Sequence, residues 1–157
     1  ASKVLKHILE GKGYKVIMTR ESHDVNISNS ERAIFANNNK ADMVVRVHAD
    51  SLNNPGKTGA SILIPDKESK YTTAIYEDSK NCADLISSKM KEAGIKVNGV
   101  FERGDLTGFN WSQVPVVLVE MGFLSNYTED QMMSNPEYQT KLMQAISDGL
   151  DEYFANK

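Results

Sequence analysis

The most apolar run of the chain is Val114-Pro115-Val116-Val117-Leu118-Val119, and it leads directly into the acidic residue Glu120. Four consecutive aliphatic residues are typical of a strand that is buried on both faces of a sheet. Because Pro115 has no N–H to donate, it belongs near the start of that strand. A second β-branched run, Met43-Val44-Val45-Arg46-Val47, predicts another mostly buried strand, which ends at His48.

Segments with helical spacing of apolar residues alternate with these runs. They predict helices from the amino terminus to Gly11, after a capping box from Ser28 to Glu31, over 71–93, and from about 134 onward. Short strands are expected at 14–18 and 60–64, and 98–113 is expected to be a surface loop with at most one short strand. The residues expected to be buried on the second and last helices are Ala33, Ile34, Ala36, Leu142, Ile146, Leu150 and Tyr153.

This alternation indicates a single α/β domain of the phosphorylase/hydrolase-like kind. We expect a mostly parallel, twisted sheet flanked by helices on both faces. With 157 residues, the chain is long enough to bury a full core as one domain.

Composition excludes several classes of protein. The 18 basic and 21 acidic residues give a net charge of −3, which argues against a nucleic-acid-binding surface. No apolar run approaches the ~20 residues that cross a bilayer, so no membrane span is expected. The single cysteine, Cys82, excludes an internal disulfide and a zinc site built from cysteines. A histidine-based metal site must therefore draw on His7, His23 and His48, of which the first two are expected to be partly exposed and inert.

The two apolar strands each deliver one titratable residue, His48 and Glu120. Open α/β sheets bind ligands beyond the carboxyl ends of their strands, where such residues converge. A carboxylate that follows four aliphatic residues is costly to desolvate without a cation, a metal or a donor beside it. Glu120 is therefore either a paired structural acid or a functional one. His48 is either bonded to a nearby backbone carbonyl or part of a site.

The loop ahead of the second strand contains Arg103 and Asn110-Trp111. One interpretation places Arg103 and Asn110 on the rim of a cleft, where an arginine fork can hold a carboxylate. The other leaves Arg103 in solvent while Trp111 anchors the loop on the core. Ser51 can line the same cleft, and Arg46, charged in the middle of a strand, needs a buried partner or a groove.

Five blocks of the sequence occur in a recognisable order. They are Gly13-Tyr14-Lys15-Val16-x-x-Thr19-Arg20, Ser30-Glu31-Arg32-x-x-x-Ala36-Asn37-x-x-x-Ala41-Asp42, Val45-Arg46-Val47-His48-Ala49-Asp50-Ser51, Glu102-Arg103-x-Asp105-Leu106-Thr107-Gly108-x-Asn110-Trp111, and the block from Val114 to Asn126 that contains Val119-Glu120-Met121-Gly122-Phe123. Together they resemble the signature blocks of zinc-dependent N-acetylmuramoyl-L-alanine amidases of the bacterial cell-wall and sporulation type. The resemblance covers essentially the whole chain.

The resemblance implies a peptidoglycan hydrolase that cuts the amide between N-acetylmuramic acid and the L-alanine of the stem peptide. In this family zinc is held by a histidine in a Gly-His-Gly-Gly-type turn, a glutamate on the first helix, and a second histidine that corresponds to His48. The catalytic glutamate corresponds to Glu120. Arg103, Asn110 and Ser51 are the expected substrate-binding residues.

The chain departs from the family pattern at its amino end, because the histidine turn and the helix glutamate would precede the block that begins at Gly13. We therefore expect residues 1–157 to form one amidase-like catalytic domain that is incomplete at its amino end. It would lack the first strand and the metal-binding turn. Zn²⁺ is expected in the complete domain, and weakly or not at all in this chain, whose own amidase activity is expected to be negligible.

The alternative interpretation is a non-catalytic cell-wall-binding or regulatory module on the same fold. In either case the expected partner is the muramyl peptide of peptidoglycan, and a separate cell-wall-binding domain is expected elsewhere in the full-length protein. The expected location is extracellular, at the cell wall, as for a secreted autolysin. The alternative location is the mother-cell compartment during sporulation.

Overall fold

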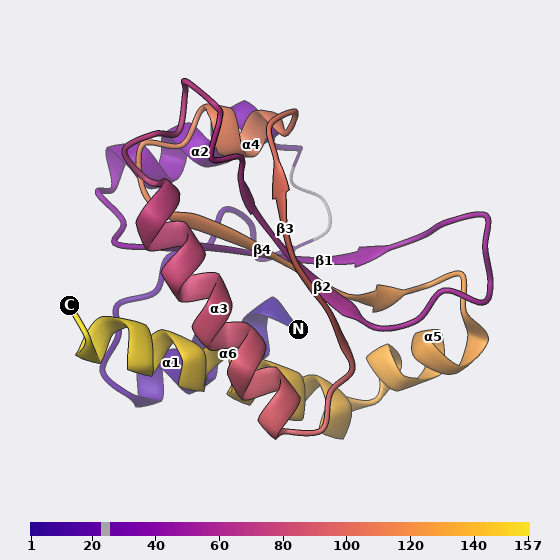
Figure 1. Cartoon of the computed structure of the whole chain (residues 1–157). Helices are drawn as coiled ribbons and strands as arrows, with labels where there is room; N and C mark the ends of the chain where they lie inside the picture. The colour runs from indigo at the N-terminus through magenta and orange to yellow at the C-terminus, as the bar shows by residue number, and fades with distance from the viewer. Residues whose placement is uncertain (23–25) are drawn as a thin grey trace.

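The computed structural model describes residues 1–22 and 26–157, so His23 lies outside the described residues. A four-stranded sheet in the order β1-β4-β2-β3 forms its centre (Figure 1). The strands are β1 (Val44–Asp50), β2 (Ala60–Pro65), β3 (Val97–Arg103) and β4 (Val116–Phe123). The pairs β1–β4 and β2–β3 are parallel, whereas the central pair β2–β4 is antiparallel. The predicted mostly parallel sheet is thus confirmed.

Helices lie on both faces of this sheet, as predicted. They are α1 (Ser2–Gly11), α2 (Asn29–Asn38), α3 (Tyr76–Glu92), α4 (Thr107–Asn110), α5 (Tyr127–Ser134) and α6 (Pro136–Ala155). Figure 1 shows α1, α3 and α6 below the sheet, and α2 with the short α4 above it. In the described part of the chain, no helix is both long and apolar enough to cross a membrane.

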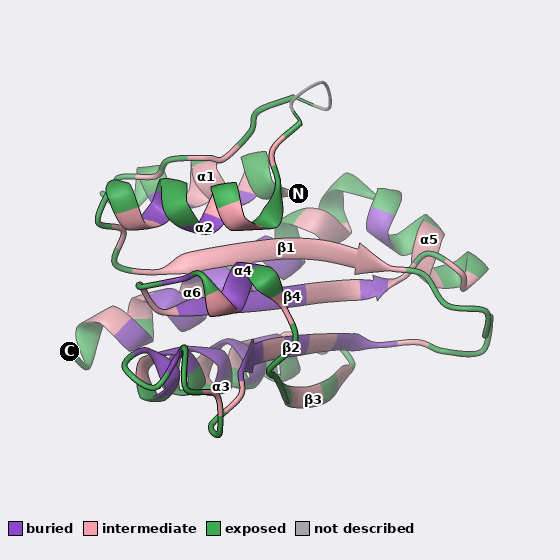
Figure 2. Ribbon diagram, turned by 90° about the horizontal axis from the view of Figure 1, so that it is seen from above, coloured by how far each residue is buried: buried purple, intermediate pink, exposed green. Residues whose placement is uncertain are grey.

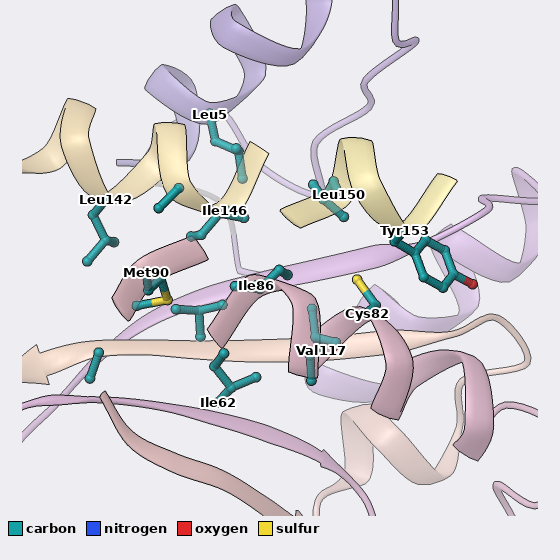
Figure 3. Packing of buried hydrophobic residues seen from close by; sticks show 14 of the residues in the cluster. Leu5, Ile62, Cys82, Ile86, Met90, Val117, Leu142, Ile146, Leu150 and Tyr153 are labelled. Carbon is teal, nitrogen blue, oxygen red and sulfur yellow. The ribbon is translucent and has the colours of Figure 1, made fainter. Parts of the chain in front are cut away.

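Alternate residues of β4 pack into two separate apolar clusters. Val117 and Val119 point toward α1, α3 and α6 and belong to the larger cluster, part of which is drawn in Figure 3. Val116 and Leu118 belong to a smaller cluster with Phe109 of α4. The strand is therefore buried on both faces, as its sequence predicts. By contrast, Figure 2 shows the edge strand β1 with intermediate burial along its whole length.

The expected strand at 14–18 is not formed. Tyr14 is instead held on α6, where its hydroxyl donates to Asp151 Oδ1 at 2.8 Å and its ring lies 5.7 Å from that of Phe154. A strand requires a neighbouring strand to exchange backbone hydrogen bonds with, and these side-chain contacts place the segment against a helix.

The segment 98–113 has more regular structure than its sequence predicts. Its first residues continue β3 to Arg103, and residues 107–110 form α4. The pairing of β3 with β2 outweighs the low strand propensity of this glycine-containing segment. The helix α5 was not predicted from the sequence, although its N-cap is a capping signal. Asn126 Oδ1 accepts from the Glu129 N–H at 3.0 Å.

The capping box was predicted correctly, because Ser28 Oγ accepts from the Glu31 N–H at 3.2 Å. However, Ile34 is 38% exposed rather than buried, since α2 turns only Ala33 and Ala36 fully inward. The long helix begins at Tyr76 and not at residue 71.

Candidate active site

The register of the sheet brings His48 and Glu120 together. They are direct partners across the parallel pair β1–β4, and paired residues on adjacent strands point to the same face. Both line a cavity of about 360 Å³. The two residues selected from the sequence therefore share one site.

The sequence predicts a site beyond the carboxyl ends of the strands. The cavity lies instead on the face of the sheet. Its floor includes Leu63 and Leu118, which also contact the smaller apolar cluster beneath α4. The short α4 spans only Thr107–Asn110, and side chains of β1, β2 and β4, among them His48, Ser61 and Glu120, line the cavity.

Glu120 has the electrostatic environment of a functional acid. Its Oε2 atom is buried and has no hydrogen-bond partner within residues 1–22 and 26–157. Burial, and then the negative charge of Asp50, raise the pKa of Glu120 to about 7, although Arg46 opposes this shift. Since no paired cation holds this carboxylate in the described structure, the arrangement favours the functional interpretation over the paired structural acid.

His48 is half-buried, and its pKa is lowered from its ordinary value of 6.5. Burial is the largest cause, followed by the positive charges of Arg46 and Arg32, whereas Asp50 opposes the shift. The imidazole is therefore neutral at pH 7, which is the form that accepts a hydrogen bond or ligates a metal.

Arg46, a charged residue in the middle of β1, lies in the cavity that also contains His48 and Glu120. Its Nη2 donates to Asn29 Oδ1 at 2.7 Å, and its guanidinium packs on Gly108 of α4. A Cβ at Gly108 would lie 2.1 Å from Arg46 Nη1, so a larger residue there would displace the Arg46 guanidinium. Arg46, His48 and Asp50 all line the cavity. Asp50 was not selected from the sequence as a site residue. It lies two residues after His48 on β1, and this spacing places both on the same face of the strand.

The three predicted substrate-binding residues are placed differently. Arg103 lines the cavity, but its Nε and Nη2 both donate to the carboxylate of Asp105 at 2.8 Å, which occupies its fork. Asn110 donates to the Gly104 carbonyl at 3.0 Å and does not line the cavity. Ser51 is exposed, and its N–H donates to Asp50 Oδ1 at 2.7 Å. Their roles in binding substrate stay predictions.

Trp111 does not anchor its loop on the core, because it is 55% exposed. The loop is held instead by Asn37 of α2. The Asn37 amide donates to the Trp111 carbonyl at 2.9 Å, and its Oδ1 accepts from the Gln113 N–H at 2.8 Å.

The donor set of the cavity does not by itself form a zinc site. Within the described ranges, no group of three or more His, Cys, Asp or Glu side chains is placed to hold a metal ion. Catalytic zinc sites generally use three protein ligands. His48 is the one imidazole among the described residues that line the cavity.

The raised pKa of Glu120 predicts a pH-dependent stability. Between pH 4.5 and about 7 the folded chain keeps a proton that the unfolded chain has lost, so the free energy of unfolding falls as pH rises. Ionising Glu120 in the folded chain therefore costs up to about 3 kcal/mol of stability, and about 1–2 kcal/mol after water screening of a half-buried group.

We expect Glu120→Gln to be more stable than the parent at pH 8 by this smaller amount. The variant should also have lost the fall in unfolding free energy between pH 5 and 8, as measured by urea unfolding. The exposed replacement Glu68→Gln should leave the slope unchanged. Parallel slopes for parent and Glu120→Gln would show that the carboxyl titrates normally.

Comparisons with known proteins identify the family to which the chain is similar. The family model described as N-acetylmuramoyl-L-alanine amidase matches residues 1–152. The probable cell wall amidase LytH of Staphylococcus saprophyticus is 28% identical over 154 residues, which cover 98% of this chain and 47% of the relative. LytH of Staphylococcus aureus is 29% identical over 155 residues, covering 98% and 47%. The chain thus spans about half the length of these curated relatives.

Solved structures show the same fold. The amidase Ami1 from Mycobacterium smegmatis superposes with a TM-score of 0.90 at 26% identity, covering 99% of this chain and 74% of that one. The CwlD amidase from Clostridioides difficile, solved in complex with the GerS lipoprotein, gives a TM-score of 0.84 at 25% identity, covering 98% and 82%.

Proposed function

Because the chain belongs to the N-acetylmuramoyl-L-alanine amidase family, we propose that it provides the catalytic carboxylate and the substrate cleft of a peptidoglycan hydrolase. The reaction is hydrolysis of the amide that joins the lactyl group of N-acetylmuramic acid to L-alanine. The observation that supports this most directly is the half-buried carboxyl of Glu120, whose Oε2 has no hydrogen-bond partner among the described residues and which lies beside His48 in one open cavity.

Glu120 acts as the general base and then as the general acid. Its carboxylate accepts a proton from the water that attacks the amide carbonyl carbon. It returns that proton to the nitrogen of L-alanine as the carbon–nitrogen bond breaks, so that a carboxylic acid and a free amine leave. A pKa of about 7 suits both steps, because the group is partly ionised at neutral pH and is a competent acid when protonated.

The family is generally zinc-dependent, and the described residues do not complete a zinc site. We assign His48 as one ligand, by its match to the family's second histidine. The remaining ligands would come from a segment that the family carries ahead of the block at Gly13.

We therefore expect the 157-residue chain alone to bind Zn²⁺ weakly and to release no stem peptide from peptidoglycan. A zinc titration against a chelating dye, with a stem-peptide release assay beside it, measures both. His48→Ala should abolish the residual binding, whereas His7→Ala should not change it. Tight one-to-one zinc binding with metal-dependent release of stem peptide by this chain would refute the assignment.

The second candidate function is a non-catalytic module that binds peptidoglycan. The observation in its favour is the lack of a three-ligand metal group in residues 1–22 and 26–157. The two functions differ in a chain that also includes the family's metal-binding segment: an amidase then releases stem peptide, and a binding module does not.

The curated relatives are named cell wall amidases, which indicates action at the cell wall. We propose an extracellular location there, with the mother-cell compartment of a sporulating cell as the alternative. A separate cell-wall-binding domain in the full-length protein is also proposed.

A further inference from the structure

We propose that a second hollow beside the candidate active site binds a free carboxylate of the stem peptide through Lys57 and Lys96. This inference rests on the proposed function, because it assigns the peptide side of the same substrate. The hollow therefore defines the direction in which the substrate crosses the sheet.

The hollow has a volume of about 340 Å³ and adjoins the cavity of Glu120. Ser61, Phe101 and Phe123 line both spaces, so the two form one groove across the open face of the sheet. Phe101 is 46% exposed at their junction, which provides an apolar wall between the acid and the lysines. A ligand that enters the groove at Glu120 can thus extend along Phe101 toward Lys57 and Lys96.

The second hollow is positively charged. Lys57 and Lys96 both line it, and none of the described residues that line it is acidic. Neither lysine forms an ion pair within the ranges that the structure describes. Glu129 of α5 reaches the same loop, but its two oxygens accept from the N–H groups of Gly59 and Phe123, each at 2.9 Å. The ammonium groups are therefore available to an anionic ligand.

The local structure holds this site in place before a ligand arrives. Lys96 Nζ donates to Thr58 Oγ1 at 2.8 Å, and the amide of Asn98 donates to the Thr58 carbonyl at 3.0 Å. Gly59 has φ +100°, and a Cβ there would lie 2.7 Å from Asn98 Oδ1, so glycine is required for this close packing. An ammonium group that is already positioned loses less side-chain entropy when it binds.

The chemistry of the substrate determines which part of the muramyl peptide can bind to Lys57 and Lys96. The lactyl carboxyl of N-acetylmuramic acid is consumed in the scissile amide, so the remaining free carboxylates belong to the peptide. Two ammonium groups, each with three N–H donors, match such a carboxylate. The peptide therefore extends past Phe101 toward Lys57 and Lys96, and the glycan lies on the opposite side of Glu120, toward Arg46.

The test is an NMR titration of the ¹⁵N-labelled chain with two probes. They are the γ-methylamide of N-acetylmuramoyl-L-alanyl-D-glutamate, whose α-carboxylate is its one free carboxylate, and the α-carboxamide of the same compound, which has no free carboxylate. At low salt we expect the parent chain to bind the carboxylate about three- to tenfold more tightly. The double variant Lys57→Ala/Lys96→Ala should bind both probes equally. Lys91→Ala, an exposed lysine of α3, is the matched control and should retain the preference.

The outcomes separate this inference from the proposed function. Shifts at the Glu120 amide without a preference for the carboxylate, or with a preference that the double variant retains, overturn the lysine site and leave the amidase assignment standing. Shifts that never include the Glu120 amide, for either probe, overturn the proposed function and with it this orientation of the substrate. A preference that the double variant loses and Lys91→Ala retains establishes the site.

Discussion

Replacing Glu120 by glutamine should abolish hydrolysis of the muramoyl–L-alanine amide in a chain that also includes the family's metal-binding segment. Glutamine keeps the size of the side chain but can neither take a proton from water nor return one to the leaving amine. General acid–base catalysis is typically worth about 10²–10⁴-fold, so we expect a loss in kcat of at least that order. The measurement is the release of stem peptide from purified peptidoglycan at saturating substrate.

The accompanying measurements separate this loss from damage to the fold. Metal content should stay at the level of the parent, because Glu120 is assigned as a base and not as a ligand. In the 157-residue chain alone, the stability at pH 8 should rise rather than fall, as the pKa of Glu120 predicts. Glu68→Gln, in an exposed turn, should keep full activity. Turnover within a few fold of the parent in Glu120→Gln would require another residue to be the base.

Gly149→Ala should destabilise the chain strongly. Gly149 lies on the buried side of α6, and a Cβ there would come within 2.6 Å of Ile86 Cα on α3. Because that neighbour is backbone, one of the two helices must move. Overpacking of this kind typically costs about 1–3 kcal/mol and occasionally more. The higher helix propensity of alanine, about 1 kcal/mol, offsets only part of it. We expect a net loss of about 1–2 kcal/mol, measured as a lower urea midpoint with an unchanged m-value.

The matched control for this prediction is Gly11→Ala. Gly11 is the last residue of α1, and no atom lies within 4 Å of a Cβ built there. Its free energy of unfolding should change by no more than about 0.5 kcal/mol. If Gly149→Ala were as stable as Gly11→Ala, the close approach of α3 and α6 would not be a requirement of the fold.

The elements with strong periodicity were predictable from the sequence. The aliphatic run before Glu120 forms β4, the β-branched run before His48 forms β1, and the predicted face of the last helix is buried as Leu142, Ile146, Leu150 and Tyr153. The errors lie where tertiary contacts outweigh local preference. Contacts between Tyr14 and α6 hold 14–18 away from the sheet, and burial of Phe109 in the smaller apolar cluster accompanies the unpredicted helix α4.

The candidate site was predictable in part, for a similar reason. His48 and Glu120 could be selected because each follows an aliphatic strand, and the register confirms that they are neighbours. The pairing of the Arg103 guanidinium with the Asp105 carboxylate could not be predicted, because the local fold of the loop brings these two side chains together. Lys57 and Lys96 are 39 positions apart in the sequence. Only the pairing of β2 with β3 brings them to one hollow.

The alternation along β4 links the chemistry of the chain to its folding. Val119 packs in the main core, and the next residue, Glu120, faces the cavity. A shift of β4 by a single residue would bury the carboxylate in the core and expose the valine. A partly folded chain with slipped strands therefore cannot retain a partly functional site. In a chain that also includes the family's metal-binding segment, heat inactivation and loss of the core should coincide, so residual activity would measure the fraction of correctly folded molecules.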